Sequence, residues 1–480
     1  MTLSVLQLLS VVFVPVLLGA ALLRLQGVVP RTDPLAYLGW SWLQGCLGVA
    51  VMLSLSLWLR LPMSAAWLSP VLLACAGTAC FLGRGVPVVE RGPREDHPRW
   101  ERLCFAVVVG LLLVSTVDRI LLASADVLVG SDEALIWAAK AKVMFHTGGF
   151  GTEFLEGMQT HVLISHPYYP PLNPLLQLWV HVHAGEIVHV ESRLPMQVFG
   201  LAGILVAASA LRRRARPLVA AAFLVLVGTL GRFFTYQAFS DALIAISLLT
   251  CWDLWQRFQE DGELHWLRML GASAPVLVWS KDEGQLHVLV FALAVLVAVM
   301  ARRVRLPEHR DRLRCLAWAT PLLVSILYIH WFNRHFGLVS YLLEESAHVV
   351  DPTAAQGDPR FLGFSLRNVG HNALPILEDF AARIASPTGP ARGLLGIFLV
   401  VLVLSPRSAG EGRRLVFTLG LVLALLGYMS VYLVTPWEVK EQLKHSAHRL
   451  VYQLAPAAGL WVLLFVVGAL PRLSGSRTRA

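Results

Sequence analysis

The sequence predicts an all-α protein that crosses a membrane many times. Of its 480 residues, 56% are hydrophobic and only 15% are charged, whereas about a quarter of the residues in a soluble domain carry a charge. The mean hydropathy is correspondingly high, at +0.63. The apolar residues fall in blocks of about 17–22, the length that a helix needs to cross a bilayer. Together these observations predict a polytopic helical membrane protein.

The apolar blocks predict about thirteen transmembrane helices. The first block has no basic segment before it, so we expect a retained span rather than a cleaved signal peptide. The predicted spans are 4–23, 36–59, 66–83, 103–123, 196–211, 217–231, 236–254, 267–279, 285–301, 313–332, 393–405, 414–434 and 451–470.

Basic residues in the connectors predict the orientation of the spans. Cytoplasmic connectors concentrate Lys and Arg, and a count of thirteen spans puts every Arg-rich connector on one side. We therefore expect the N-terminus outside and the C-terminus inside, and we ascribe the net charge of +9 to these connectors rather than to nucleic-acid binding. The basic segments are Arg24/Arg31, the Arg84–Arg102 connector, Arg212–Arg214, the Arg302–Arg314 connector, Arg407/Arg413/Arg414 and the Arg472–Arg479 tail.

The same count places two long loops and three short segments outside. These outer segments carry nearly all the unusual polar residues of the chain, and they are 124–195, 232–240, 280–284, 333–392 and 435–450. The predicted organisation is N-terminal spans with a connector (1–102), a catalytic membrane module (103–332), an outer loop (333–392) and C-terminal spans (393–480).

The first outer loop, 124–195, is predicted to contain two interfacial helices. Ser131 is a candidate N-cap, with Asp132 and Glu133 in the first turn. Apolar residues then recur at helical spacing opposite Lys140, which predicts a helix lying along the membrane surface. These apolar residues are Ile136, Ala139 and Val143.

A Pro-rich turn leads into the second predicted helix of this loop. Pro170 and Pro171 favour an extended backbone before the short apolar helix 172–182. Trp179 is of a type enriched at membrane interfaces. The His166–Leu172 turn, with His166, Tyr168 and Tyr169, is a candidate substrate-binding segment, together with Lys140 of the first helix.

Three carboxylates are candidates for catalysis. Asp132 and Glu133 stand beside a helix that would shield them from water, where a carboxylate can act as a general base. Their alternative role is to complement the helix dipole. Asp241 opens a span at its outer end, where an acid is costly unless it is paired or functional; the alternative is a helix cap.

The candidate phosphate ligands lie in two later outer segments. In the turn 279–284, Lys281 could bind a phosphate and Glu283 could orient it, although a solvated turn accounts for the same residues. In the cluster 440–449, Arg449 suits a bidentate phosphate contact. His445 and His448 are its candidate partners, and the alternative is a cluster that anchors the last span at the interface.

Histidines also raise the possibility of a metal site in the first outer loop. Their spacing matches no standard zinc pattern, so we expect no metal and no other cofactor. The residues concerned are His161, His166, His181, His183 and His189.

In their order and common side, these motifs resemble the GT-C class of integral-membrane glycosyltransferases. The nearest branch is the bacterial relatives of protein mannosyltransferases and aminoarabinose transferases. The resemblance is carried by Asp132-Glu133, Tyr169-Pro170-Pro171-Leu172, Asp241 and Lys281-Asp282-Glu283-Gly284, and it covers residues 103–300 and 449–456.

The resemblance implies transfer of a sugar from a polyprenyl-phosphate donor to a lipid, glycan or protein acceptor, with inversion, at the outer face of the cytoplasmic membrane. Asp132, with Glu133 beside it, would match the base and Asp241 the second acidic position. Relatives often carry Lys before Pro-Pro-Leu, where this chain has Tyr169. Phosphate binding would therefore depend on Lys281, Arg449 and the two neighbouring histidines.

Two other functions fit the composition. A transporter or flippase would carry charges buried within spans and inverted repeats, and neither is evident in the sequence. A non-catalytic scaffold of envelope assembly would tolerate replacement of Asp132 and Asp241.

Overall fold

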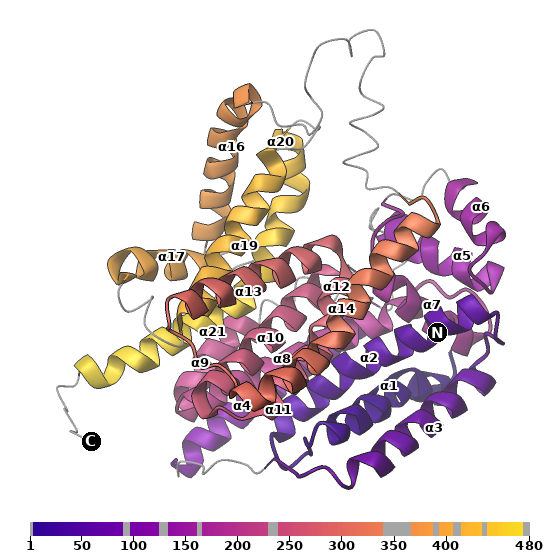
Figure 1. Ribbon diagram of the computed structural model, residues 1–480, viewed down its shortest axis with the longest axis horizontal. Helices are drawn as coiled ribbons and strands as arrows, with labels where there is room; N and C mark the ends of the chain where they lie inside the picture. Colours follow the sequence, from indigo (N-terminus) through magenta and orange to yellow (C-terminus); the bar gives the residue numbers. More distant parts are fainter. Residues whose placement is uncertain are drawn as a thin grey trace.

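The computed structural model describes residues 3–89, 97–123, 133–160, 166–228, 239–338, 366–386, 393–406, 414–433 and 439–473. Within these ranges the chain forms helices and no strand (Figure 1). Nine helices of the described chain are long and apolar enough to cross a membrane. The predicted all-helical architecture is confirmed, and these nine helices support a polytopic membrane protein.

The helices that build the molecule follow one another in the order of the predicted spans. They are α1 (Val5–Leu25), α2 (Pro34–Leu59), α3 (Ala65–Gly83), α4 (Arg99–Ala123), η1 (Glu133–Ala138), α5 (Ala139–Thr147), α6 (Thr152–Thr160), α7 (Leu172–Ala184), η2 (Glu191–Arg193), α8 (Leu194–Arg214), α9 (Pro217–Gly228), α10 (Asp241–Asp261), α11 (Leu264–Ser273), α12 (Pro275–Ser280), α13 (Asp282–Met300), η4 (His309–Asp311), α14 (Arg312–His335), α16 (Leu366–Ala385), α17 (Leu394–Leu404), α19 (Leu415–Leu433), α20 (Val439–Gln442), η6 (Leu443–Ala447) and α21 (His448–Leu473).

The predicted count of thirteen spans is not confirmed. The helices α9 and α17 have only 12 and 11 residues, fewer than a bilayer crossing needs. The predicted span 267–279 is divided into α11 and α12, because Pro275 at the start of α12 lacks the backbone N–H that would continue α11. The membrane topology stays a prediction.

Helix α1 packs against both α2 and α3 (Figure 1), and its contact with α2 depends on small residues. A Cβ on Gly19 of α1 would lie 1.8 Å from the carbonyl oxygen of Ser41 in α2. A Cβ on Gly45 of α2 would likewise lie 1.8 Å from the carbonyl oxygen of Pro15 in α1. Glycine at both positions therefore permits the close backbone approach that is common between membrane helices.

Helix α7 is buried among other helices, and its predicted place at the membrane interface stays a prediction. Trp179 is 1% exposed, and its indole Nε1 donates to the Val11 carbonyl of α1 at 3.1 Å. The His183 ring contacts the hydroxyls of Ser10 and Ser69 at 3.0 and 3.1 Å. Helix α7 is thus anchored in the N-terminal bundle by Trp179 and His183.

Helix α10 lies at the centre of the fold and connects two clusters of charge. It packs against α8, α11 and α21, and 19 of its 21 residues are buried. At 1.5 Å per residue its ends are about 31 Å apart. Asp241 opens the helix at one end, and Asp253 and Arg257 lie toward the other.

Candidate functional site

The site is built around the buried carboxylate of Asp241, at the first residue of α10. Arg449 of α21 donates to Asp241 Oδ2 from Nε at 3.0 Å and from Nη2 at 2.8 Å. Gln453, one turn further along α21, donates to Oδ1 at 2.6 Å. The Lys281 ammonium lies 3.6 Å from the same Oδ1. Residues far apart in sequence thus surround one carboxylate with two cations and an amide.

Lys281 stands at a sharp break between α12 and α13. Its backbone is extended (φ −170°, ψ 163°), which ends α12 and begins α13 at the next residue. A Cβ on Gly284 would lie 1.8 Å from the Leu277 carbonyl oxygen, so glycine lets the two helices meet this closely. The break directs the Lys281 ammonium toward both Asp241 and Glu283, whose Oε1 lies 2.6 Å away.

The ring of Tyr169, from the Pro-rich turn, joins this group. Two ammonium groups approach it, with Lys281 Nζ 5.6 Å and Lys140 Nζ 5.9 Å from the ring centroid. The ring also stacks on Trp137, with centroids 5.5 Å apart and planes inclined by 20°. Cations over an aromatic face are attracted by the ring quadrupole, so Tyr169 helps to hold both lysines.

Lys140 is buried, contrary to the prediction that it faces away from the apolar side of its helix. Its side chain is 2% exposed, and Nζ donates to the carbonyls of His166 at 2.7 Å and Tyr169 at 3.2 Å. Because His166 takes the left-handed conformation (φ 55°), its carbonyl oxygen can meet Lys140. Burial lowers the pKa of Lys140 from 10.5 to about 7, opposed by the attraction of Asp282.

The acidic pair of the first outer loop is only partly described. Asp132, the predicted base, lies outside the described residues. Glu133 is fully buried, and its two carboxylate oxygens accept from Arg193 Nε at 2.6 Å and Nη2 at 3.2 Å. Both oxygens are engaged by one guanidinium, so this geometry favours a structural role for Glu133. Its catalytic role stays a prediction.

The remaining predicted residues lie at different distances from Asp241. His448 is half-buried and close enough to Arg449 and Asp241 for electrostatic interaction. His445 is exposed and contacts Glu441 at 3.7 Å, so it is not part of the Asp241 cluster. Tyr168 is buried, and its carbonyl accepts from Asn333 Nδ2 at 2.9 Å. It therefore fixes the Pro-rich turn to α14.

A buried chain of hydrogen bonds behind Asp241 was not predicted from the sequence. Gln453 accepts a short hydrogen bond from the Tyr428 hydroxyl, which also lies 2.6 Å from His287 Nε2. The chain therefore runs from Asp241 through Gln453 and Tyr428 to His287 of α13. Polar side chains inside apolar spans are costly unless they are paired or functional, and this rule could have identified both Gln453 and His287.

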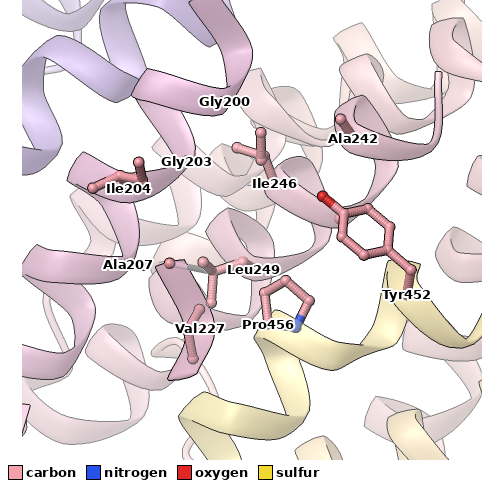
Figure 2. A pocket seen from close by; sticks show the side chains of 12 residues that line it. Gly200, Gly203, Ile204, Ala207, Val227, Ala242, Ile246, Leu249, Tyr452 and Pro456 are labelled. Atoms are coloured by element: carbon pink, nitrogen blue, oxygen red, sulfur yellow. The ribbon is translucent and has the colours of Figure 1, made fainter. Parts of the chain in front are cut away.

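A narrow apolar pocket is lined on α10 from Ala242, the residue after Asp241, to Leu249 (Figure 2). Small residues of α8, such as Gly203 and Ala207, face Ala242 and Leu249 of α10 there. The side chain of Tyr452, from α21, projects toward α10 in the same view. The pocket therefore continues the site into the apolar part of the bundle, but it leaves little free space.

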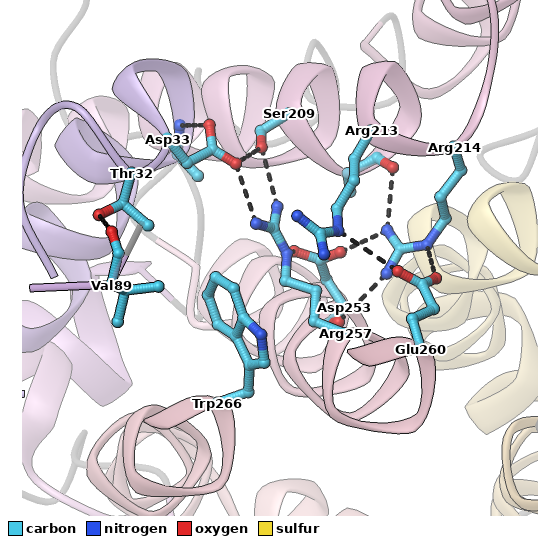
Figure 3. Close-up of polar contacts among 12 residues, drawn as sticks. Thr32, Asp33, Val89, Ser209, Arg213, Arg214, Asp253, Arg257, Glu260 and Trp266 are labelled. Atoms are coloured by element: carbon cyan, nitrogen blue, oxygen red, sulfur yellow. Dashed lines mark hydrogen bonds and ion pairs between the residues drawn. The ribbon is translucent and has the colours of Figure 1, made fainter. Parts of the chain in front are cut away.

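A second cluster of charges toward the other end of α10 was also missed (Figure 3). Arg257 donates to Asp253 Oδ2 at 2.8 Å and contacts Asp33 Oδ2 at 3.0 Å. Arg214 from the end of α8 contacts Asp253 Oδ1 at 2.5 Å and Glu260 Oε1 at 2.7 Å. Every charge named here has a partner, so this cluster joins α2, α8 and α10 rather than presenting a free group.

In the described residues, no group of three or more His, Cys, Asp and Glu side chains is arranged to hold a metal ion. His181 and His183 have separate partners: His181 Nδ1 accepts from the Val188 N–H at 3.3 Å, while His183 contacts serines of α1 and α3. Comparisons of the chain with models of protein families, with curated proteins and with solved structures find no match. The conclusions about function therefore depend on the site itself.

Proposed function

We propose that the protein is a glycosyltransferase of the bacterial cytoplasmic membrane. In this proposal it moves a sugar from a polyprenyl-phosphate donor to an acceptor at the outer face of the membrane, with inversion. The observation that supports it most is the gathering of Arg449, Lys281 and Lys140 around Asp241 and Tyr169, near the starts of α13 and α21, which are long and apolar enough to cross a membrane.

The chemistry of a lipid-linked donor fits such a group of cations. The apolar tail of the donor stays in the bilayer, so its phosphate is held at the membrane interface. A departing phosphate carries negative charge, which fixed cations in a partly dry site stabilise strongly. Arg449 supplies the planar guanidinium that suits a phosphate, and Lys281 and Lys140 add two ammonium groups.

In this proposal Asp241 positions cations and does not act as the base. Its oxygens already face Arg449, Lys281 and Gln453, and neighbouring positive charge makes a carboxylate a poorer proton acceptor. The base that deprotonates the acceptor is assigned to Asp132, on the resemblance to the GT-C class. The chain would accordingly require Asp132 for proton removal and Asp241 for the arrangement of the phosphate ligands.

The first test measures transfer of radiolabelled sugar from polyprenyl-phosphate donors to a membrane extract. The variants are Asp132→Asn and Arg449→Lys, and the control is Arg310→Gln in an exposed connector. We expect transfer by the wild type and the control, loss in Asp132→Asn, and weaker donor binding in Arg449→Lys because the bidentate contact is removed. Absence of transfer by the wild type with every donor would contradict the proposal and favour a transporter or a scaffold.

A further inference from the structure

A large apolar pocket lies between α10, α11, α13 and α14, away from the Asp241 cluster. It has a volume of about 390 Å³, within the range of small-molecule sites. Its walls are almost wholly apolar, with Trp252, Trp255 and Phe291 among the larger side chains. Its lining on α10 extends from Leu248 to Phe258, about 15 Å at the helical rise, or roughly half of the hydrocarbon core of a bilayer.

The two ends of this pocket differ in charge. His287, at the end nearer the site, is bonded to Tyr428. At the opposite end is Arg305, just beyond α13. The Arg305 side chain is exposed and makes no hydrogen bond or ion pair with any residue that the structure describes. The pocket therefore combines an apolar interior with one available cation at its mouth.

The backbone that carries Arg305 is held in place by α10. Gln259, 1% exposed, donates from Nε2 to the Arg305 carbonyl at 3.1 Å and accepts from the Arg305 N–H at 2.9 Å. The last helical turn is followed by Gly262 (φ 83°), where a Cβ would lie 2.5 Å from Arg305 Nη1. Two hydrogen bonds and a glycine thus place the guanidinium at the end of α10, beside the pocket mouth.

The basic connector after α13 adds positive charge at this mouth. Arg302 and Arg303 precede Arg305 and are exposed. By contrast, the guanidinium of Arg310 in the same connector lies 2.9 Å from Glu308. Basic pockets between membrane helices bind anionic lipid head groups, and Arg matches the geometry of a phosphate.

We propose that this pocket binds one acyl chain of an anionic phospholipid whose phosphate contacts Arg305. The lipid belongs to the leaflet opposite the Asp241 cluster, because Arg305 and Asp241 lie toward opposite ends of the helices. This lipid is neither the donor nor the acceptor of the proposed sugar transfer, so its binding is a separate property of the protein. By filling the space between α10 and α13, it would support the helices that carry Asp241 and Glu283.

The test uses the full-length protein in nanodiscs of phosphatidylcholine with a trace of phosphatidylglycerol that carries a photoreactive diazirine in one acyl chain. Labelled peptides are mapped by mass spectrometry. We expect labels on the peptides of Trp252, Trp255 and Phe291, and competition by unlabelled phosphatidylglycerol but not by added phosphatidylcholine. Loss of a charged hydrogen bond in Arg305→Gln is expected to lower labelling about tenfold, while Arg310→Gln leaves it unchanged.

A second pair of variants tests the pocket itself without disturbing the core. Ala319 lines the pocket and is exposed on α14, and Ala317 is exposed on the same helix but does not line it. Ala319→Trp should exclude the acyl chain and abolish labelling, whereas Ala317→Trp should not.

Equal labelling of Arg305→Gln and wild type, or equal labelling by a phosphatidylcholine probe, would overturn the proposal. Competition by a polyprenyl phosphate that depends on Arg449 rather than Arg305 would also overturn it, because the pocket would then hold the donor tail. None of these measurements requires sugar transfer, so they test lipid binding even if the protein transfers no sugar.

Discussion

The replacement Asp241→Asn tests whether the buried carboxylate organises the site. The amide is nearly the same size, and its Oδ1 can still accept from Gln453. The replacement removes the negative charge that lies 2.8 Å from Arg449 and 3.6 Å from Lys281. Lys281 keeps Glu283 as a partner at 2.6 Å, so the largest change falls on Arg449.

The expected loss of stability follows from the burial of the pair. Asp241 is fully buried, and the Arg449 side chain is 12% exposed. Breaking a buried ion pair from one side costs about 3–5 kcal/mol, because the other charge is left without compensation. This is a large fraction of the roughly 5–15 kcal/mol by which a protein is stable. The double variant Asp241→Asn/Arg449→Gln should recover part of the loss, since it also removes the guanidinium that faced the carboxylate.

The assay is thermal unfolding of purified protein in one detergent, followed by sugar transfer at a temperature where the variants remain folded. The matched control is Asp253→Asn, on the same helix, which loses partners in Arg214 and Arg257. Both single variants should unfold at lower temperature, but only Asp241→Asn should lose transfer per folded molecule. An unchanged unfolding temperature in Asp241→Asn would refute the energetic reasoning, and unchanged transfer would refute the role of Asp241 in the site.

Four further predictions concern the surroundings of this carboxylate. Burial lowers the pKa of Lys140 from 10.5 to about 7. Between these pH values the unfolded chain binds a proton that the folded chain releases, so the free energy of unfolding should rise with pH in this window. Chemical denaturation at several pH values should show that Lys140→Met lacks this rise, and the same rise in both proteins would contradict the prediction. Transfer should decline above about pH 7 if protonated Lys140 contributes to phosphate binding, and Lys140→Met should lack this step in a pH–rate profile. Glu133→Gln should cost about 3–5 kcal/mol by breaking the buried ion pair with Arg193, whereas loss of transfer with unchanged thermal stability would identify Glu133 as a catalytic base. Gly284→Ala should lower the free energy of unfolding by about 1–3 kcal/mol or more through overpacking against Leu277, and it should lower transfer by moving Lys281. Unfolding and transfer equal to those of the wild type would show that α12 and α13 can accommodate a methyl group at this contact.

Several features of the site could be predicted because they depend on residue type and local pattern. Asp241 begins a helix as expected, Lys281 and Arg449 lie beside its carboxylate, and Glu283 contacts Lys281. An acid or a cation at the end of an apolar block is conspicuous in sequence, because its transfer into a bilayer is costly. The polar chain through Tyr428 was missed because a tyrosine in an apolar span is equally compatible with ordinary packing.

The sequence by itself determined the helical class and the approximate position of the helices in most of the predicted spans, because hydropathy and period are local properties of the chain. It did not identify the helices α6 and α16, which lie in segments predicted as outer loops. It could not determine that α7 is enclosed by protein, since an apolar helix buried in protein and one in lipid have the same hydropathy. Nor could it show that Lys140 is buried or that Glu133 pairs with Arg193, 60 residues away. Asp241 and Arg449 are 208 residues apart. Only the tertiary structure decided these partners, because an ion pair depends on distances of a few ångströms that no local pattern encodes.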